Sequence, residues 1–173
     1  MASRPLRFGA LVGTLLCVCS VLPSEPSRSA PGLTEVELKA VFLLRLPQFV
    51  SWSDERRATN FCTTETSEVS NLLAEMVATE PRGRSVRLIE VGQADGCDVV
   101  FGPAGTLSDT TPVEALLVSD EPGYAKNGGM VELKRRGARI GLVVNLDALE
   151  SVGLRASSKL LQLSEVVGEG RDD

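Results

Sequence analysis

The chain has 173 residues, with 18 Lys and Arg, 23 Asp and Glu, no histidine, and a formal net charge of −5. Without histidine, neither Ser-His-Asp nor Cys-His nucleophilic sites nor the two-histidine zinc-protease motif can be built in their usual form. The acidic balance argues against nucleic acid as a partner.

Residues 1–30 are predicted to be a signal peptide and leader. Arg4 and Arg7 precede an uncharged apolar run from Phe8 to Leu22, which is shorter than the ~20 residues of a membrane-spanning helix. This pattern is typical of secretory signal peptides. Cleavage after Ser20 and cleavage after Ala30 both fit the small residues nearby, whereas an uncleaved anchor would need a longer run.

Two cysteines remain after such cleavage, Cys62 and Cys97. An even pair in an exported protein most often forms a disulfide, and closing this loop would stabilise the fold by roughly 3–4 kcal/mol. Two buried thiols are the alternative. A lone cysteine pair lacks the further ligands that zinc needs, so we expect neither a metal nor a cofactor.

The first half of the domain, which we place at residues 31–168, alternates helices and strands. Thr34 and Glu37 form a capping box for a helix that Pro47 ends near Leu46. Strands are predicted over 59–64, 86–91, 97–101 and 115–119, with a second helix bearing Val69, Leu72, Leu73, Met76 and Val77. Such alternation predicts an α/β fold with a mainly parallel sheet that helices cover on both faces.

The last third of the domain has a different pattern. Strands over 130–133 and 138–144, joined by a basic turn, predict an antiparallel C-terminal hairpin. Asn145 can cap a helix that ends at Gly153. Ser157 can cap a last helix, predicted to bear Leu160, Leu161, Leu163, Val166 and Val167, before a polar tail over 169–173.

Several motifs occur in an order that is specific to one family. The segment 39–52 ends in Phe-Val-Ser-Trp, and Phe61-Cys62 and the run 96–101 follow it. The most specific part comprises Gly128-Gly129-Met130, Arg139, Asn145, Gly153-Leu154, Ser157-Ser158 and Leu160-Leu161. Over roughly Val36 to Val167 the chain resembles the YfiR-like periplasmic proteins.

The resemblance implies a Rossmann-like three-layer sandwich located in the periplasm. It implies a regulatory protein that binds the sensor region of an inner-membrane diguanylate cyclase and represses cyclic-di-GMP synthesis, and with it biofilm formation. Related domains occur beside sensor kinases, so a kinase is a second type of partner, and a homodimer stays open. Cys62 and Cys97 match the family's structural disulfide, whereas the second cysteine pair of some relatives is missing here.

The candidate partner-binding residues follow from the same motifs. They are Gly128, Gly129, Met130, Arg139, Asn145, Leu154, Ser157 and Ser158. Turn formation, helix capping and core packing explain the same residue types equally well. No catalytic residue is predicted.

The alternative function is a small-molecule-binding sensor domain that feeds a membrane signalling protein. Doubly wound sheets bind ligands beyond the carboxyl ends of their strands. In this chain, Asp95, Ser108 and Asp120 would offer polar contacts there.

Overall fold

The computed structural model describes residues 32–54, 60–80, 83–109 and 114–169. The chain divides at Pro31, and the described residues belong to the second of its two units, Gly32–Asp173. The predicted signal peptide and leader, and all but the first residue of the predicted tail, lie outside the described residues.

The second unit is built on a seven-stranded sheet with the strand order β3-β2-β4-β5-β6-β7-β9. The strands are β2 (Asn60–Thr63), β3 (Ser85–Leu88), β4 (Val99–Phe101), β5 (Leu116–Ser119), β6 (Val131–Arg136), β7 (Arg139–Asn145) and β9 (Ser164–Val167). All neighbours are parallel except β6 and β7. The predicted mainly parallel sheet with its antiparallel hairpin is therefore confirmed.

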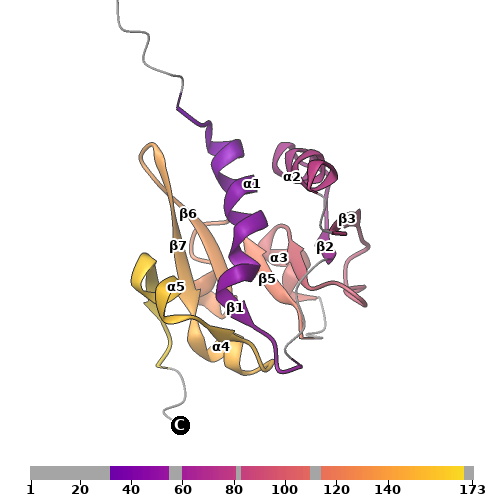
Figure 1. Ribbon diagram of the computed structural model, residues 1–173. Coiled ribbons are helices and arrows are strands. Elements are labelled where there is room, and N and C mark those ends of the chain that lie inside the picture. The colour runs from indigo at the N-terminus through magenta and orange to yellow at the C-terminus, as the bar shows by residue number, and fades with distance from the viewer. Residues whose placement is uncertain (1–31, 55–59, 81–82, 110–113, 170–173) are drawn as a thin grey trace, which may run out of the picture. The chain divides into compact units, whose positions relative to one another are not determined.

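Helices cover this sheet to form a three-layer α/β sandwich, as predicted (Figure 1). They are α1 (Glu35–Arg45), α2 (Glu68–Thr79), α3 (Ala104–Ser108), α4 (Leu146–Glu150) and α5 (Ser158–Leu163), with short 3₁₀ turns η1 (Leu46–Phe49) and η2 (Ala125–Asn127). Every residue of β4 and β5 is buried, as expected for central strands covered on both faces.

The start of α1 follows the predicted capping box. The Thr34 hydroxyl accepts a hydrogen bond from the Glu37 amide at 3.2 Å, and the Glu37 carboxylate accepts one from the Thr34 amide at 2.6 Å. The helix gives way to η1 at Leu46, where Pro47 interrupts the α-helical hydrogen bonds. Figure 1 shows α1 lying across the sheet, where it buries Ala40, Leu43 and Leu44.

The predicted last helix is too long. It ends at Leu163, and Ser164–Val167 instead forms the edge strand β9, which pairs parallel with β7. Val166 and Val167 are β-branched residues, which fit a strand better than a helix. The last turn of the predicted helix is therefore replaced by an additional sheet edge.

A second, two-stranded sheet ties the end of η1 to the C-terminal part of the domain. In it, β1 (Val50–Ser51) pairs antiparallel with β8 (Arg155–Ala156). Trp52 follows β1 directly and is buried, and its indole N–H donates to the Glu114 carbonyl oxygen at 2.8 Å. The Phe-Val-Ser-Trp motif thus holds the segment that follows α1 against the core.

Candidate functional site

A disulfide joins β2 to the segment that precedes β4. The sulfurs of Cys62 and Cys97 are bonded, with their Cα atoms 5.8 Å apart. This is the pairing that the sequence predicts. Both side chains are buried, at 1% and 5% exposure, so the bond belongs to the interior of the domain rather than to an open redox site.

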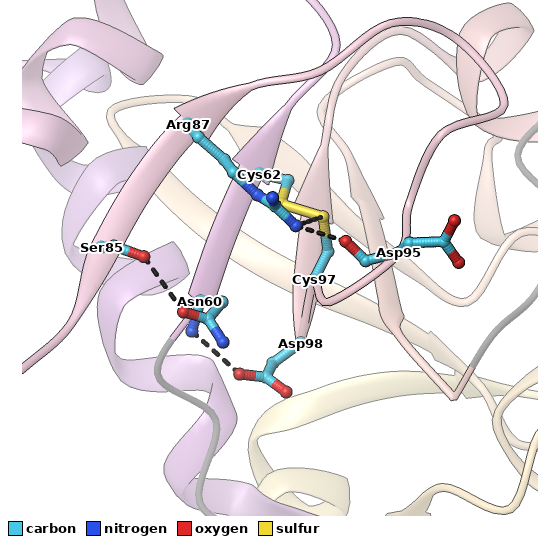
Figure 2. Close-up of a disulfide and its surroundings, with 7 residues drawn as sticks. All are labelled: Asn60, Cys62, Ser85, Arg87, Asp95, Cys97 and Asp98. Carbon is cyan, nitrogen blue, oxygen red and sulfur yellow. Dashed lines mark hydrogen bonds between the residues drawn. A yellow bond between two sulfur atoms is a disulfide. The ribbon is translucent and has the colours of Figure 1, made fainter.

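The Arg87 guanidinium lies over this disulfide (Figure 2). Its Nε is 3.4 Å from the Cys62 sulfur and its Nη2 is 3.5 Å from the Cys97 sulfur, and Nη2 also donates to the Asp95 carbonyl oxygen. Arg87 belongs to the edge strand β3. The edge strand, the disulfide and the loop before β4 are thereby held together.

The predicted Gly128-Gly129-Met130 motif forms a tight turn between η2 and β6. Gly128 adopts a left-handed conformation with φ +97°, which glycine enters without steric cost. Burial raises the pKa of the Tyr124 phenol to about 12, and a backbone hydrogen bond with Met130 opposes part of that rise. Met130 is itself buried, so this motif shapes the interior as well as the surface.

Asn145 holds the same turn from the end of β7. Its Nδ2 donates to the Ala125 carbonyl oxygen at 2.9 Å, while its Oδ1 accepts from the Ala148 amide at 3.1 Å and so caps α4. The Asn145 amide donates to the Met130 carbonyl oxygen at 2.9 Å. Asn145 therefore connects η2, the turn and α4, through its side chain and its backbone amide.

The second predicted cluster lies around the start of α5. Gly153 has φ +78° and ends the turn after α4, and Leu154 is fully buried. Ser157 caps α5 by accepting from the Leu160 amide at 3.3 Å, and its own amide donates to the Phe49 carbonyl oxygen at 2.8 Å. Ser158 begins the helix and is exposed.

The predicted partner-binding residues therefore occupy three places. Gly128, Gly129, Met130 and Asn145 meet at one hydrogen-bonded corner, and Leu154, Ser157 and Ser158 lie at the start of α5. Arg139 is exposed beside the hairpin turn. Only Gly128, Arg139 and Ser158 are exposed, so the assignment of all of these residues to a partner surface stays a prediction.

An apolar groove of about 340 Å³ lies between α1, β7 and α5, and it was missed in the sequence analysis. Its lining residues are Val41, Phe42, Arg45, Leu46, Phe49, Ile140, Gly141, Leu142, Leu160 and Leu163. Leu163 is 69% exposed at one wall. One sequence signal could have revealed the groove. Val41 and Phe42 are apolar but do not belong to the buried face of α1, which consists of Ala40, Leu43 and Leu44.

Two further hollows border β7 and share lining residues with this groove. One shares Ile140 with it and is also lined by Leu33, Arg135 and Arg139. The other shares Gly141, Leu142 and Leu163 and is also lined by Arg136 and Glu165. The first adjoins the groove at Ile140, whereas Arg136 reaches the second from the opposite face of the hairpin, on which a Cβ atom at Gly141 would also lie.

Basic side chains gather on the face of the sheet opposite Ile140 and Leu142. Glu165 on β9 accepts from Lys126 at 2.8 Å, Lys134 at 3.0 Å and Arg136 at 2.8 Å. Hydrogen bonds from Lys126 and then Lys134 lower the pKa of the Glu165 carboxyl to about 2. One carboxylate therefore faces three cations, and the cluster keeps a positive charge.

The polar residues of the predicted ligand cleft make contacts within the domain. Asp120 forms an ion pair with Lys39 at 2.7 Å, which helps to raise the pKa of that lysine against the opposing effect of burial. The Ser108 hydroxyl donates to the Ala104 carbonyl oxygen at 2.9 Å. These two side chains are thus engaged at the sheet's carboxyl edge.

Two further findings concern the described part of the chain. Within it, no three His, Cys, Asp or Glu side chains gather in a group that could hold a metal ion. No helix there has the length and apolar character needed to cross a membrane.

Comparison with known proteins supports the same fold. A crystal structure of a conserved domain protein from Vibrio cholerae matches with a TM-score of 0.53 at 13% sequence identity, covering 79% of this chain. The match spans 61% of that structure's chain, and at this identity it supports the fold alone. No curated protein matches this chain. The family model described as YfiR/HmsC-like matches residues 36–165, and the chain belongs to that family.

Proposed function

We propose that this protein is a periplasmic regulator that binds the sensor region of an inner-membrane diguanylate cyclase and represses cyclic-di-GMP synthesis. The observation that carries the proposal is the family match over residues 36–165, which spans nearly the whole described domain. The buried Cys62–Cys97 disulfide agrees with residence in an oxidising compartment.

A regulator of this kind needs a surface that binds its partner protein, and it needs no reactive groups. A cyclase that interconverts between active and inactive forms responds only to a difference in affinity between the two. Repression therefore requires tighter binding to the inactive form, and a hundredfold preference gives about 2.7 kcal/mol of bias. A rigid domain loses little conformational entropy on binding, and the disulfide and the Asn145 hydrogen bonds favour such rigidity.

Protein binding is favoured over small-molecule sensing by the kind of surface that the domain presents. The groove between α1, β7 and α5 is apolar and reaches the surface at Leu163, whereas Asp120 and Ser108 at the predicted ligand cleft already have partners. Small-molecule sites combine an enclosed apolar cavity with a few converging polar groups.

Capture from the native host tests the proposal. The full chain is expressed there with a C-terminal tag, and its complexes are isolated from membranes in mild detergent. We expect a membrane protein with a diguanylate cyclase domain to be retained, and its purified periplasmic region to bind the tagged chain directly. The matched control is the same tagged chain lacking residues 1–30, which should stay in the cytoplasm and retain no cyclase.

Two outcomes would contradict the proposal in different ways. Retention of a sensor kinase without any cyclase would keep the regulatory role but assign it to another enzyme class. Equal retention by the chain lacking residues 1–30 would place the contact outside the periplasm.

A further inference from the structure

We infer that the groove between α1, β7 and α5 docks an amphipathic helix whose polar flanks are acidic, contributed by the membrane partner. The inference rests on the proposed function and names the surface and the chemistry of the contact. It is argued from the groove's walls, its backbone and its charges.

The groove's walls are apolar and reach the surface. Phe42 and Phe49 are only partly buried on the α1 side, and Leu163 is 69% exposed on the α5 side. Leu33, beside the start of α1, adds exposed apolar area in the adjoining hollow. Contiguous apolar surface with a polar rim is typical of an interaction site.

The backbone geometry favours a helix over an extended strand as the occupant. The floor of the groove is the face of β7 around Ile140 and Leu142. This strand pairs with β6 along one edge and with β9 only from Leu142 onward along the other. A strand that lay on this face would be outside the plane in which β7 makes its hydrogen bonds, so its buried amides would stay unpaired. A helix satisfies its own backbone and can lay an apolar stripe between α1 and α5, as helix-in-groove complexes do.

The charges around the groove define the flanks of that helix. Three arginines line the groove and the hollow beside Ile140 (Arg45, Arg135 and Arg139). Two carboxylates face them, Glu35 at 3.1 Å from Arg135 and Glu80 at 4.0 Å from Arg45. The Lys159 ammonium adds a further cation 5.9 Å from the centre of the Phe49 ring. The whole chain has a net charge of −5, so this positive rim is a local excess.

A second copy of the chain would fit this surface poorly. A two-fold contact brings the same patch of both subunits together, and the exposed Arg45 and Arg139 of each would then face like charges. Glutamate or aspartate on either side of an apolar stripe would instead pair with them. Electrostatic complementarity of this kind selects partners and speeds association.

Two exposed leucines provide a matched test of the surface. Leu163 lies on the groove wall, whereas Leu88, at 61% exposure, lies on β3 at the opposite edge of the sheet. We expect Leu163→Glu to weaken binding of the captured cyclase's periplasmic region by about tenfold or more, because a leucine loses its apolar contact. Leu88→Glu should bind as the unchanged chain does, and both variants should keep its melting temperature.

The acidic flanks are tested by charge removal. Arg45→Gln combined with Lys159→Gln should weaken the same binding and reduce its dependence on salt, because exposed charges act through a screened field. Undiminished binding by Leu163→Glu, or an unchanged salt dependence, would overturn the inference while the proposed function stands.

Photo-crosslinking in cells identifies the occupant directly. A photo-reactive amino acid is placed at position 163, or at position 88 as the control, in the full chain expressed in its native host. Cross-linked peptides are then sequenced. A peptide with an apolar stripe at helical spacing and a net negative charge, obtained only from position 163, is the expected result.

Three other crosslinking outcomes overturn the inference. A peptide from a second copy of this chain would assign the groove to a homodimer, and attachment to phospholipid would assign it to the membrane surface. No adduct at all would mean that the groove stays open. An acidic amphipathic peptide from a protein that is not a cyclase would support the inferred contact but contradict the proposed function.

Discussion

A Cβ atom placed on Gly129 would lie 2.4 Å from the ring of Tyr124. No real Cβ atom approaches a ring carbon so closely, so the tyrosine can cover this turn only because residue 129 has no side chain. Gly129 does not have a positive φ. Glycine is therefore required at this position because there is no space for a side chain.

Replacing Gly129 by alanine should lower the free energy of unfolding by roughly 1–3 kcal/mol, because the added methyl forces the buried Tyr124 ring to move. Denaturant unfolding monitored by circular dichroism measures the change. The matched control is Gly105→Ala in α3, where the new methyl meets no atom within 4 Å, and stability there should be unchanged or slightly increased. Equal effects at both positions would contradict the packing account.

Tyr124 is the only tyrosine of the chain, so its ionisation can be followed by ultraviolet absorbance. Burial raises the pKa of its phenol to about 12, against ~10 for an exposed tyrosine. The folded protein keeps this proton where the unfolded chain loses it, so stability should fall as the pH rises from ~10 towards about 12. A folded-state midpoint equal to that in concentrated urea would contradict the burial of this side chain.

The hydrogen bonds of Asn145 can be separated by two substitutions. Asn145→Ala removes both the cap of α4 and the donor to the Ala125 carbonyl oxygen, and should cost about 1–2 kcal/mol or more. Asn145→Asp keeps a capping oxygen and loses only the donor, so it should cost less. The comparison is made by thermal unfolding near neutral pH, and an aspartate variant as unstable as the alanine variant would show that the cap contributes little.

Removing the disulfide should destabilise the domain without abolishing its fold. Cys62→Ser combined with Cys97→Ser opens the loop of sequence separation 35, with an expected loss of roughly 3–4 kcal/mol. Denaturant unfolding measures this loss, and reduction of the unchanged chain by a dithiol during unfolding should give a similar value. An unfolding midpoint that neither treatment moves would show that the bond does not constrain the unfolded chain.

Glu165 should make the stability of the folded protein fall at low pH. Lys126 and Lys134 lower the pKa of this carboxyl to about 2 in the folded state, whereas an unfolded glutamate has a pKa of ~4.3. The stabilisation that the ionised Glu165 provides is therefore complete above pH ~4.3 and is lost as the pH falls towards about 2. Glu165→Gln should reduce the loss of melting temperature over this interval, and Glu121→Gln, an exposed carboxylate outside the cluster, provides the comparison. High salt should weaken the difference.

Local signals gave the most accurate sequence-based predictions. The Thr34–Glu37 capping box and the caps at Asn145 and Ser157 occur as predicted. The antiparallel hairpin is also confirmed, but its turn lies at 137–138, because residues 134–136 belong to β6 and not to the predicted turn. Each depends on residues only a few positions apart, so its physical cause is visible in the sequence.

The errors and omissions involve contacts between distant segments. Val166 and Val167 follow a genuine short helix, and only the parallel pairing of β9 with β7 decides that they form a strand. The groove was missed for the same reason, because its walls come from residues 41–49, 140–142 and 160–163. The predicted partner-binding motif led instead to residues with turn, cap and core roles, whose types do not distinguish structure from recognition.

The cyclic-di-GMP content of the native host tests the central claim most directly. Deleting the gene should raise the nucleotide's concentration, and restoring the unchanged chain or Leu88→Glu should lower it again, whereas Leu163→Glu should not. A concentration that stays the same in the deletion strain, under conditions in which the protein is normally exported, would contradict its role as a repressor of cyclase activity.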